Sequence, residues 1–104
     1  MGPPLPTHMD NQHQQQIQIK ATDEALKGLY ANMAQVAHNP EEFVIDFMNV
    51  FPPAGNLLAR MVMSPGHMKR LAQAMADNIK KYEEQFGEIK SSSQPEHKIG
   101  FRTE

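Results

Sequence analysis

The only charged residue in the most apolar stretch of the chain is Asp46, which lies between Ile45 and Phe47. A carboxylate taken out of water needs a cationic partner or a raised pKa. Arg60 lies on the next predicted strand of the same hairpin, so we expect a structural ion pair between these two side chains. The alternative is an enzyme, because a perturbed carboxylate can mark an active site. Such an enzyme would use Asp46, Arg60 and His67 in one pocket.

A second group of polar residues, His67, Lys69 and Arg70, lies at the start of a predicted helix. The first backbone N–H groups of a helix have no partner within the helix, and basic side chains beside them can help to hold an anion. The sequence therefore allows an anion-binding site at this point. The alternative is a helix start that is simply solvated, and the sequence leaves both interpretations open.

The residues needed for most other chemistry are missing. The chain has no cysteine, which excludes disulfides, thiolate metal sites and a cysteine nucleophile. It contains no paired carboxylates, Ser-His-Asp set or glycine-rich phosphate loop, and His38 and His67 are isolated. We therefore predict a protein that is not an enzyme, with no catalytic centre, no metal site and no cofactor.

The composition of the chain argues against nucleic-acid and membrane partners and indicates a compartment. The net charge of −2 gives no basic excess that would favour nucleic acid as a partner. Apolar runs are far shorter than the roughly 20 residues that span a membrane, so no membrane segment is expected. A chain without cysteine suits a reducing compartment, and we expect a cytoplasmic protein.

Strand patterns dominate the first part of the chain. Residues 17–21 alternate apolar and polar side chains, which is typical of a half-buried strand, and residues 28–38 are a second candidate. Residues 43–51 are apolar on both faces, which predicts a central strand covered on both sides. Residues 52–56 contain two prolines and are predicted to be the connection to a last strand at 57–63.

One long helix follows the strands. Ser64 is a good N-cap, Pro65 suits the first helical position, and Gly87 can end the helix. Residues 22–24 are expected to form a turn or a short helical start. The fold class is thus predicted to be α+β, a three- or four-stranded antiparallel meander followed by one long C-terminal helix. Apolar residues recur in the helix at spacings of three and four, at Met68, Leu71, Ala72, Met75, Ile79, Tyr82 and Phe86.

Two tails bracket the predicted domain at residues 17–87. Residues 1–16 are rich in proline, glutamine and asparagine and are predicted to be disordered, and the hypothesis for residues 1–8 is a cloning remnant. Residues 88–104 are predicted to be a flexible tail with a serine-rich spacer. Ile99–Phe101 is an apolar tip after that spacer. It is either a frayed end or a short peptide that docks on its own sheet or on a partner.

Four segments carry a resemblance to a known family: Gly28–Asn32, His38–Phe47, Ser64–Leu71 and Asn78–Gly87. Through them, residues 17–90 resemble a family of small uncharacterised prokaryotic proteins known only as a domain of unknown function. Gly66 departs from the glutamate often found there, which weakens the helix start. The family assigns no catalytic residues. A looser likeness, of architecture alone, is to the export chaperone SecB, which holds unfolded chains.

The strand at 43–51 also predicts self-association. One helix can cover only one face of the sheet, and each large apolar side chain left in water forfeits roughly 1.5–3 kcal/mol. We therefore expect a homo-oligomer, most simply a symmetric dimer. The monomeric alternative is that a tail, such as the tip at Ile99–Phe101, folds back over the uncovered face. The predicted function is a non-enzymatic binding or scaffold protein with a protein or peptide partner. The alternatives are a SecB-like chaperone, and a small enzyme or anion-binding protein that uses the helix N-terminus.

Overall fold

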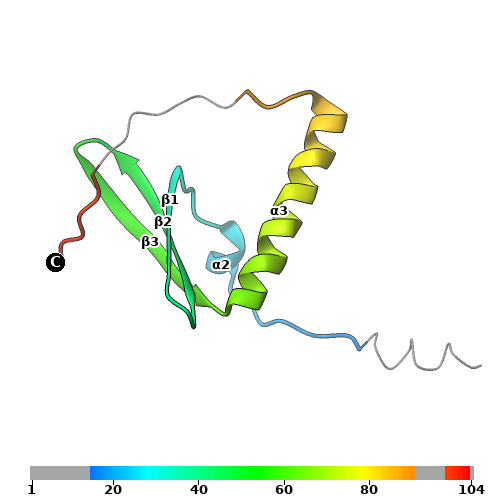
Figure 1. Ribbon diagram of the computed structural model, residues 1–104, viewed down its shortest axis with the longest axis horizontal. Helices are drawn as coiled ribbons and strands as arrows, with labels where there is room; N and C mark the ends of the chain where they lie inside the picture. The colour runs from blue at the N-terminus through cyan, green and yellow to red at the C-terminus, as the bar shows by residue number, and fades with distance from the viewer. Residues whose placement is uncertain (1–14, 91–97, 104) are drawn as a thin grey trace, which may run out of the picture.

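The computed structural model describes residues 15–90 and 98–103 of the 104-residue chain. Three strands form one antiparallel sheet in the order β1-β2-β3, and a long helix follows the sheet in the chain (Figure 1). This arrangement confirms the predicted α+β class with a three-stranded meander. The elements in chain order are α2 (Asp23–Lys27), β1 (Met33–His38), β2 (Phe43–Phe51), β3 (Ala54–Met63) and α3 (Pro65–Phe86).

The central strand β2 has the bounds that its apolar pattern predicts, but the hairpin that follows is tighter than expected. Only Pro52 and Pro53 form the turn, because Ala54–Asn56 already pair with the end of β2. The prediction of a connection over 52–56 was therefore wrong. The missing N–H groups of the two prolines affect only the turn itself, and the residues after them are free to form the ladder.

The predicted strand at 17–21 is also wrong. Residues 15–22 form no regular structure, and Ile17 and Ile19 are exposed. Alternation alone does not make a strand, since a strand needs a neighbouring ladder to satisfy its backbone groups. The helical start expected at 22–24 is confirmed, because the Thr22 side chain accepts a hydrogen bond from the Ala25 N–H and caps α2.

The second strand is shorter than its predicted range of 28–38, and a pair of asparagines shows why. The Asn32 amide accepts from the Val50 N–H at 2.8 Å and donates to the Val50 carbonyl at 3.0 Å. The Asn49 side chain in turn donates to the Tyr30 carbonyl at 3.1 Å. The Asn32 backbone N–H still donates to the Met48 carbonyl at 3.0 Å, and beyond it side-chain amides carry the contact between the two chain segments.

Helix α3 begins and ends where its local signals predict. The Ser64 hydroxyl accepts from the His67 N–H at 3.2 Å, and Pro65 is the first helical residue. Gly87 ends the helix with a φ of 96°, and its N–H donates to the Glu83 carbonyl at 2.9 Å. A positive φ of this kind favours glycine, which has no Cβ.

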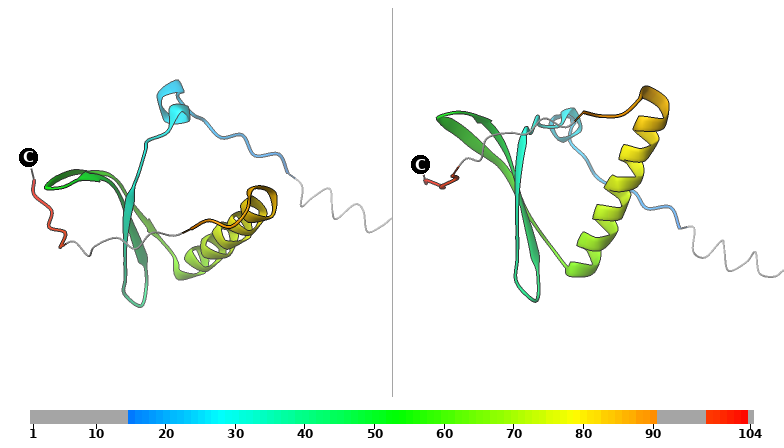
Figure 2. Two further views of the ribbon diagram at one scale, coloured as in Figure 1. Left: turned by 90° about the horizontal axis from the view of Figure 1, so that it is seen from above. Right: turned by 45° about the horizontal axis from the view of Figure 1, so that its top comes forward.

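The sheet has two different faces, and α3 and the C-terminal segment lie on opposite sides of it (Figure 2). Helix α3 starts beside the sheet and leans away from it toward its C-terminal end (Figure 1). We call the sheet face toward α3 the helix-side face; strand alternation places on it Phe43, Ile45, Phe47, Val36, Met61 and Met63. We call the other the tail-side face; it carries Val44, Asp46, Met48, Val50, Leu57 and Arg60.

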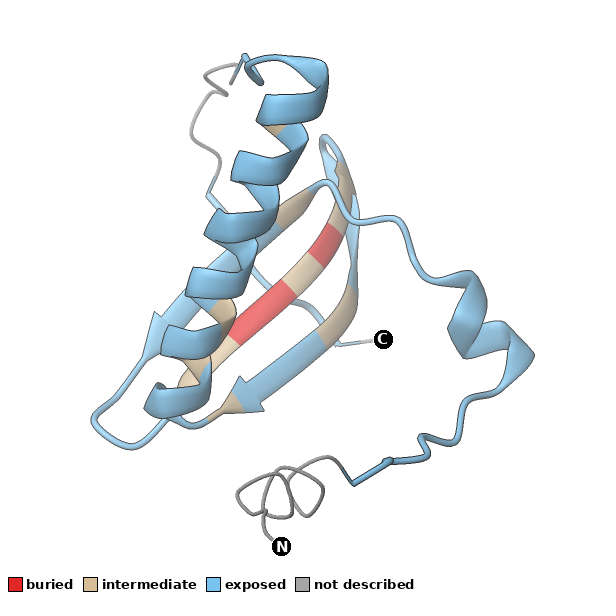
Figure 3. Ribbon diagram, turned by 90° about the vertical axis from the view of Figure 1, so that its right-hand side faces the viewer, coloured by how far each residue is buried: buried red, intermediate tan, exposed pale blue. Residues whose placement is uncertain are grey.

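The buried core of the described chain is very small and lies in β2 (Figure 3). Its apolar members are Ile45, which is 4% exposed, and Met48, which is 3% exposed. Of the predicted tails, residues 1–14 and 91–97 lie outside the described residues.

Candidate functional site

The tail-side face is built around an ion pair between neighbouring strands. Asp46 on β2 lies directly opposite Arg60 on β3 in the ladder. The Arg60 Nε donates to Asp46 Oδ1 at 2.7 Å, and Nη2 donates to Oδ2 at 3.0 Å. Both oxygens of the carboxylate are thereby used, although Asp46 is only 6% exposed. The arginine is thus the same residue that the sequence suggests as the partner of Asp46.

This geometry determines the charge state of the pair. The hydrogen bonds from Arg60 hold the pKa of Asp46 below its usual value, and burial opposes that shift without cancelling it. The same hydrogen bonds raise the pKa of Arg60. Both groups are therefore charged at neutral pH, and the carboxylate is a weak base.

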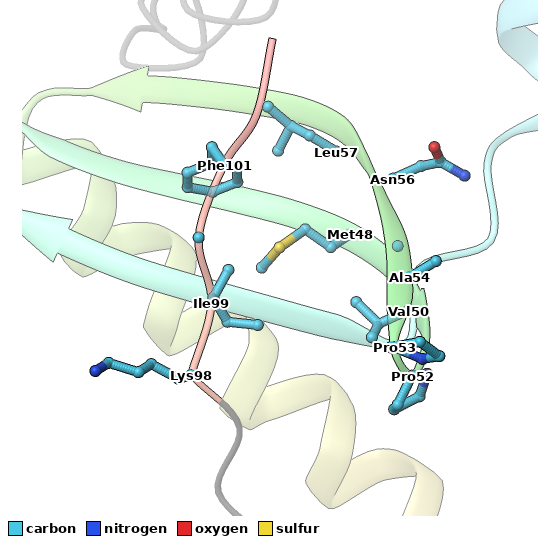
Figure 4. A pocket seen from close by; sticks show the side chains of 12 residues that line it. Met48, Val50, Pro52, Pro53, Ala54, Asn56, Leu57, Lys98, Ile99 and Phe101 are labelled. Atoms are coloured by element: carbon cyan, nitrogen blue, oxygen red, sulfur yellow. The ribbon is translucent and has the colours of Figure 1, made fainter. Parts of the chain in front are cut away.

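The C-terminal segment, residues 98–103, crosses the tail-side face of the sheet (Figure 4). The Arg60 Cζ lies 5.5 Å from the centroid of the Phe101 ring, which is a cation–π distance. Ile99 is half-buried and lines the same cavity as Met48. Of the two sequence interpretations of this apolar tip, the structure therefore shows docking on the chain's own sheet.

Two cavities remain beside the docked segment. One has a volume of about 440 Å³ and the other about 610 Å³. None of Asp46, Arg60 and His67 lines either of them. The walls of the first come from the end of the β2-β3 hairpin and from the tail: Met48, Val50, Pro52, Pro53, Ala54, Gly55, Asn56, Leu57, Lys98, Ile99, Gly100 and Phe101. This hairpin wall was not predicted from the sequence, because residues 52–56 were expected to be a plain loop.

The basic residues of the helix start lie apart from the ion pair. His67, Lys69 and Arg70 are exposed on the first turns of α3. The Arg70 Nη2 is 3.5 Å from the His67 Nδ1. Because α3 and Arg60 lie on opposite sides of the sheet, the structure does not bring His67 together with Asp46 and Arg60. The anion site stays a prediction.

The described residues offer neither a metal site nor a membrane-spanning helix. No cluster of three or more His, Asp or Glu in residues 15–90 and 98–103 could hold a metal ion. No helix in these ranges has the length and apolar character to cross a membrane.

A second feature of the molecule is an apolar surface that the described chain does not cover. Met68 and Leu71, near the start of α3, are half-buried, but the apolar stripe farther along is exposed (Figure 3). The Tyr82 and Phe86 rings contact each other with centroids 5.0 Å apart. We call the half-exposed apolar side chains of α3 and of the helix-side face the open apolar surface. Their exposed fractions are 47–66%, and they are Val36 and Met61 on the sheet and Met75, Ile79, Tyr82 and Phe86 on α3.

Comparison with known proteins places the chain in a family without assigning it an activity. The family described as protein of unknown function (DUF3467) matches residues 6–91. No curated protein matches the chain. No solved structure matches it either, so the likeness to SecB finds no support here. The match agrees with the resemblance seen in the sequence and covers both the sheet and α3. The chain therefore belongs to the DUF3467 family.

Proposed function

We propose that this protein is a non-enzymatic binding or scaffold protein that works as a homodimer and takes a protein or peptide partner. The observation that carries the proposal is the open apolar surface. Four large side chains on α3 and two on the sheet stay about half exposed. An apolar surface that extends over two elements is typical of an interaction site.

The shape of the monomer supports a second copy as the first occupant of this surface. Helix α3 leans away from the sheet toward its C-terminal end, so the sheet does not cover the far end of the helix (Figures 1 and 2). A two-fold axis pairs the same patch on both copies, so one apolar patch per chain is sufficient to form a closed dimer. Each half-exposed side chain then gains further burial at the interface.

The state of the ion pair supports a non-enzymatic role. A general base must lie within hydrogen-bond reach of the proton that it takes, and its pKa must be near the working pH. Asp46 uses both oxygens on Arg60, and its pKa is lowered by that contact. The pair is therefore suited to holding the strands and presenting a flat guanidinium rather than to moving a proton. The lack of cysteine in the chain supports a cytoplasmic location for this role.

Sedimentation equilibrium tests the proposal. A homodimer has twice the chain mass of 11.7 kDa at micromolar concentration. A mass of one chain across the whole concentration range would contradict it, because the surface would then be stable in water without a second copy.

The open apolar surface also supports a second candidate function, a chaperone that holds unfolded chains in the manner of SecB. The two candidates differ in whether the surface remains accessible in the assembly. A chaperone would form a larger assembly, bind a hydrophobic dye and suppress aggregation of an unfolded client at equimolar amounts. A scaffold dimer that buries the surface would do none of these.

A further inference from the structure

We infer that the tail-side face is a groove for extended peptides with an aliphatic residue and, two positions later, an aromatic residue. In the free protein this groove is occupied by the chain's own residues 98–103, which act as a tethered competitor. The inference rests on the proposed binding function and names the class of partner. It concerns the side of the sheet away from α3, so it is separate from the homodimer surface.

The spacing of the pattern comes from the docked segment. Residues two apart in an extended chain point to the same side. Ile99 is half-buried beside Met48, and Phe101 lies against Arg60. A Cβ placed on Gly100, between them, would meet no atom within 4 Å. The two outer residues are therefore the anchors, and the position between them has room for a Cβ.

The aromatic preference comes from the ion pair beneath Phe101. The bidentate contact with Asp46 holds the Arg60 guanidinium in one plane, which suits a ring stacked on it. The Arg60 side chain is 53% exposed, so the aromatic ring of a competing peptide can reach it in place of Phe101. A cation–π contact at such a partly exposed site favours an aromatic over an aliphatic residue by about two- to fivefold.

The docked segment is held loosely enough to be displaced. Among the described residues, no backbone hydrogen bond joins residues 98–103 to the sheet. Phe101 is still 52% exposed, and the cavity of about 440 Å³ stays open between the segment and the hairpin. The side chains of Ile99 and Phe101 thus account for the docking of residues 98–103. A peptide whose side chains fit the groove better can displace this segment.

Peptide titration of the full chain tests the groove. The probe is a capped synthetic peptide with the sequence of residues 98–103, and the readout is the amide signals of Met48, Leu57 and Arg60. The wild type is compared with the double variant Ile99→Ser/Phe101→Ser, whose own tail lacks both anchors. A tethered segment acts at an effective concentration on the order of 1 mM. For a peptide with a Kd of about 0.1 mM, the wild type then binds about tenfold more weakly than the variant.

Two controls make the result specific. Thr103→Ala, an exposed change in the same tail, is expected to bind the peptide like the wild type. A peptide with alanine in place of its phenylalanine is expected to bind the double variant at least twofold more weakly. Well-dispersed amide spectra show that each variant is folded.

Two results would overturn the inference. One is a double variant that binds no peptide, and the other is equal affinity of the wild type and the double variant. The mass measurement separates this inference from the homodimer. A dimer without peptide binding would remove the groove alone, and a monomer with peptide binding would remove the homodimer alone.

Discussion

Truncation of one side chain in the middle of the open apolar surface gives the sharpest test of the homodimer. Ile79 is 51% exposed in the chain by itself, so about half of the roughly 1.5–3 kcal/mol from burying an isoleucine is still to be gained. A two-fold interface contains the residue twice, which makes the loss in Ile79→Ala about 1.5–3 kcal/mol per dimer. At 1.4 kcal/mol per factor of ten, the dimer Kd rises about ten- to hundredfold.

Sedimentation equilibrium over a concentration series measures that Kd, and circular dichroism checks the helix. Alanine has a higher helix propensity than isoleucine, so the variant does not weaken α3 itself. The matched control is Glu84→Ala, which truncates an exposed side chain on the polar face of the same helix. The control is expected to keep the dimer Kd of the wild type within about twofold.

The reasoning would be refuted by equal dimer affinity in Ile79→Ala and the wild type. That result would place the interface elsewhere and leave the α3 stripe without its proposed partner. Equal weakening by Ile79→Ala and Glu84→Ala would also refute it, because the effect would then not depend on the apolar face.

Four other changes test the sheet and the helix end, each by urea unfolding at fixed protein concentration. Met48→Ala, at a site 3% exposed, is expected to cost about 2–5 kcal/mol, and a cost below 1 kcal/mol would show that the tail-side core is not packed. Asn32→Ala loses two hydrogen bonds to Val50 and is expected to cost about 1–3 kcal/mol, whereas no cost would mean that water replaces the side chain fully. Gly87→Ala places a Cβ at a φ of 96° and is expected to cost about 1–3 kcal/mol, with Gly100→Ala as a neutral control. Asp46→Asn is expected to be less stable than the wild type at neutral pH. Because the hydrogen bonds from Arg60 lower the pKa of Asp46, the wild type loses this advantage as the pH falls through that lowered pKa, and a constant difference at low pH would contradict the ion-pair account.

Much of the fold was predictable because its signals are local. The ends of α3 depend on Ser64, Pro65 and Gly87, and each cap acts on groups within four residues along the chain. The bounds of β2 follow from a mostly apolar run, interrupted only by Asp46 and Asn49, between polar and proline residues. The partner of Asp46 was also within reach of the sequence, because a short hairpin leaves few cations that could lie opposite it.

Other features depended on contacts between distant residues. Residues 17–21 alternate as a strand should, but the pattern does not say whether a sheet edge is available, and here none pairs with them. Before β1 begins at Met33, the Asn32 side chain bonds to Val50 at the end of β2, which is 18 residues away in the chain. Such bonds leave no periodic trace in the sequence.

The class of the fold and the helix with its apolar stripe follow from the sequence alone. Which surfaces are covered follows only from how the elements lie in space. The tip at Ile99–Phe101 docks on the tail-side face, whereas α3 leans away and leaves its own stripe exposed. An apolar pattern in the sequence indicates that burial of a side chain is favourable in free energy. It does not indicate which surface buries that side chain, because the hydrophobic effect is not directional. The chain, its tail or a second copy can each supply the cover, and the choice depends on geometry in three dimensions.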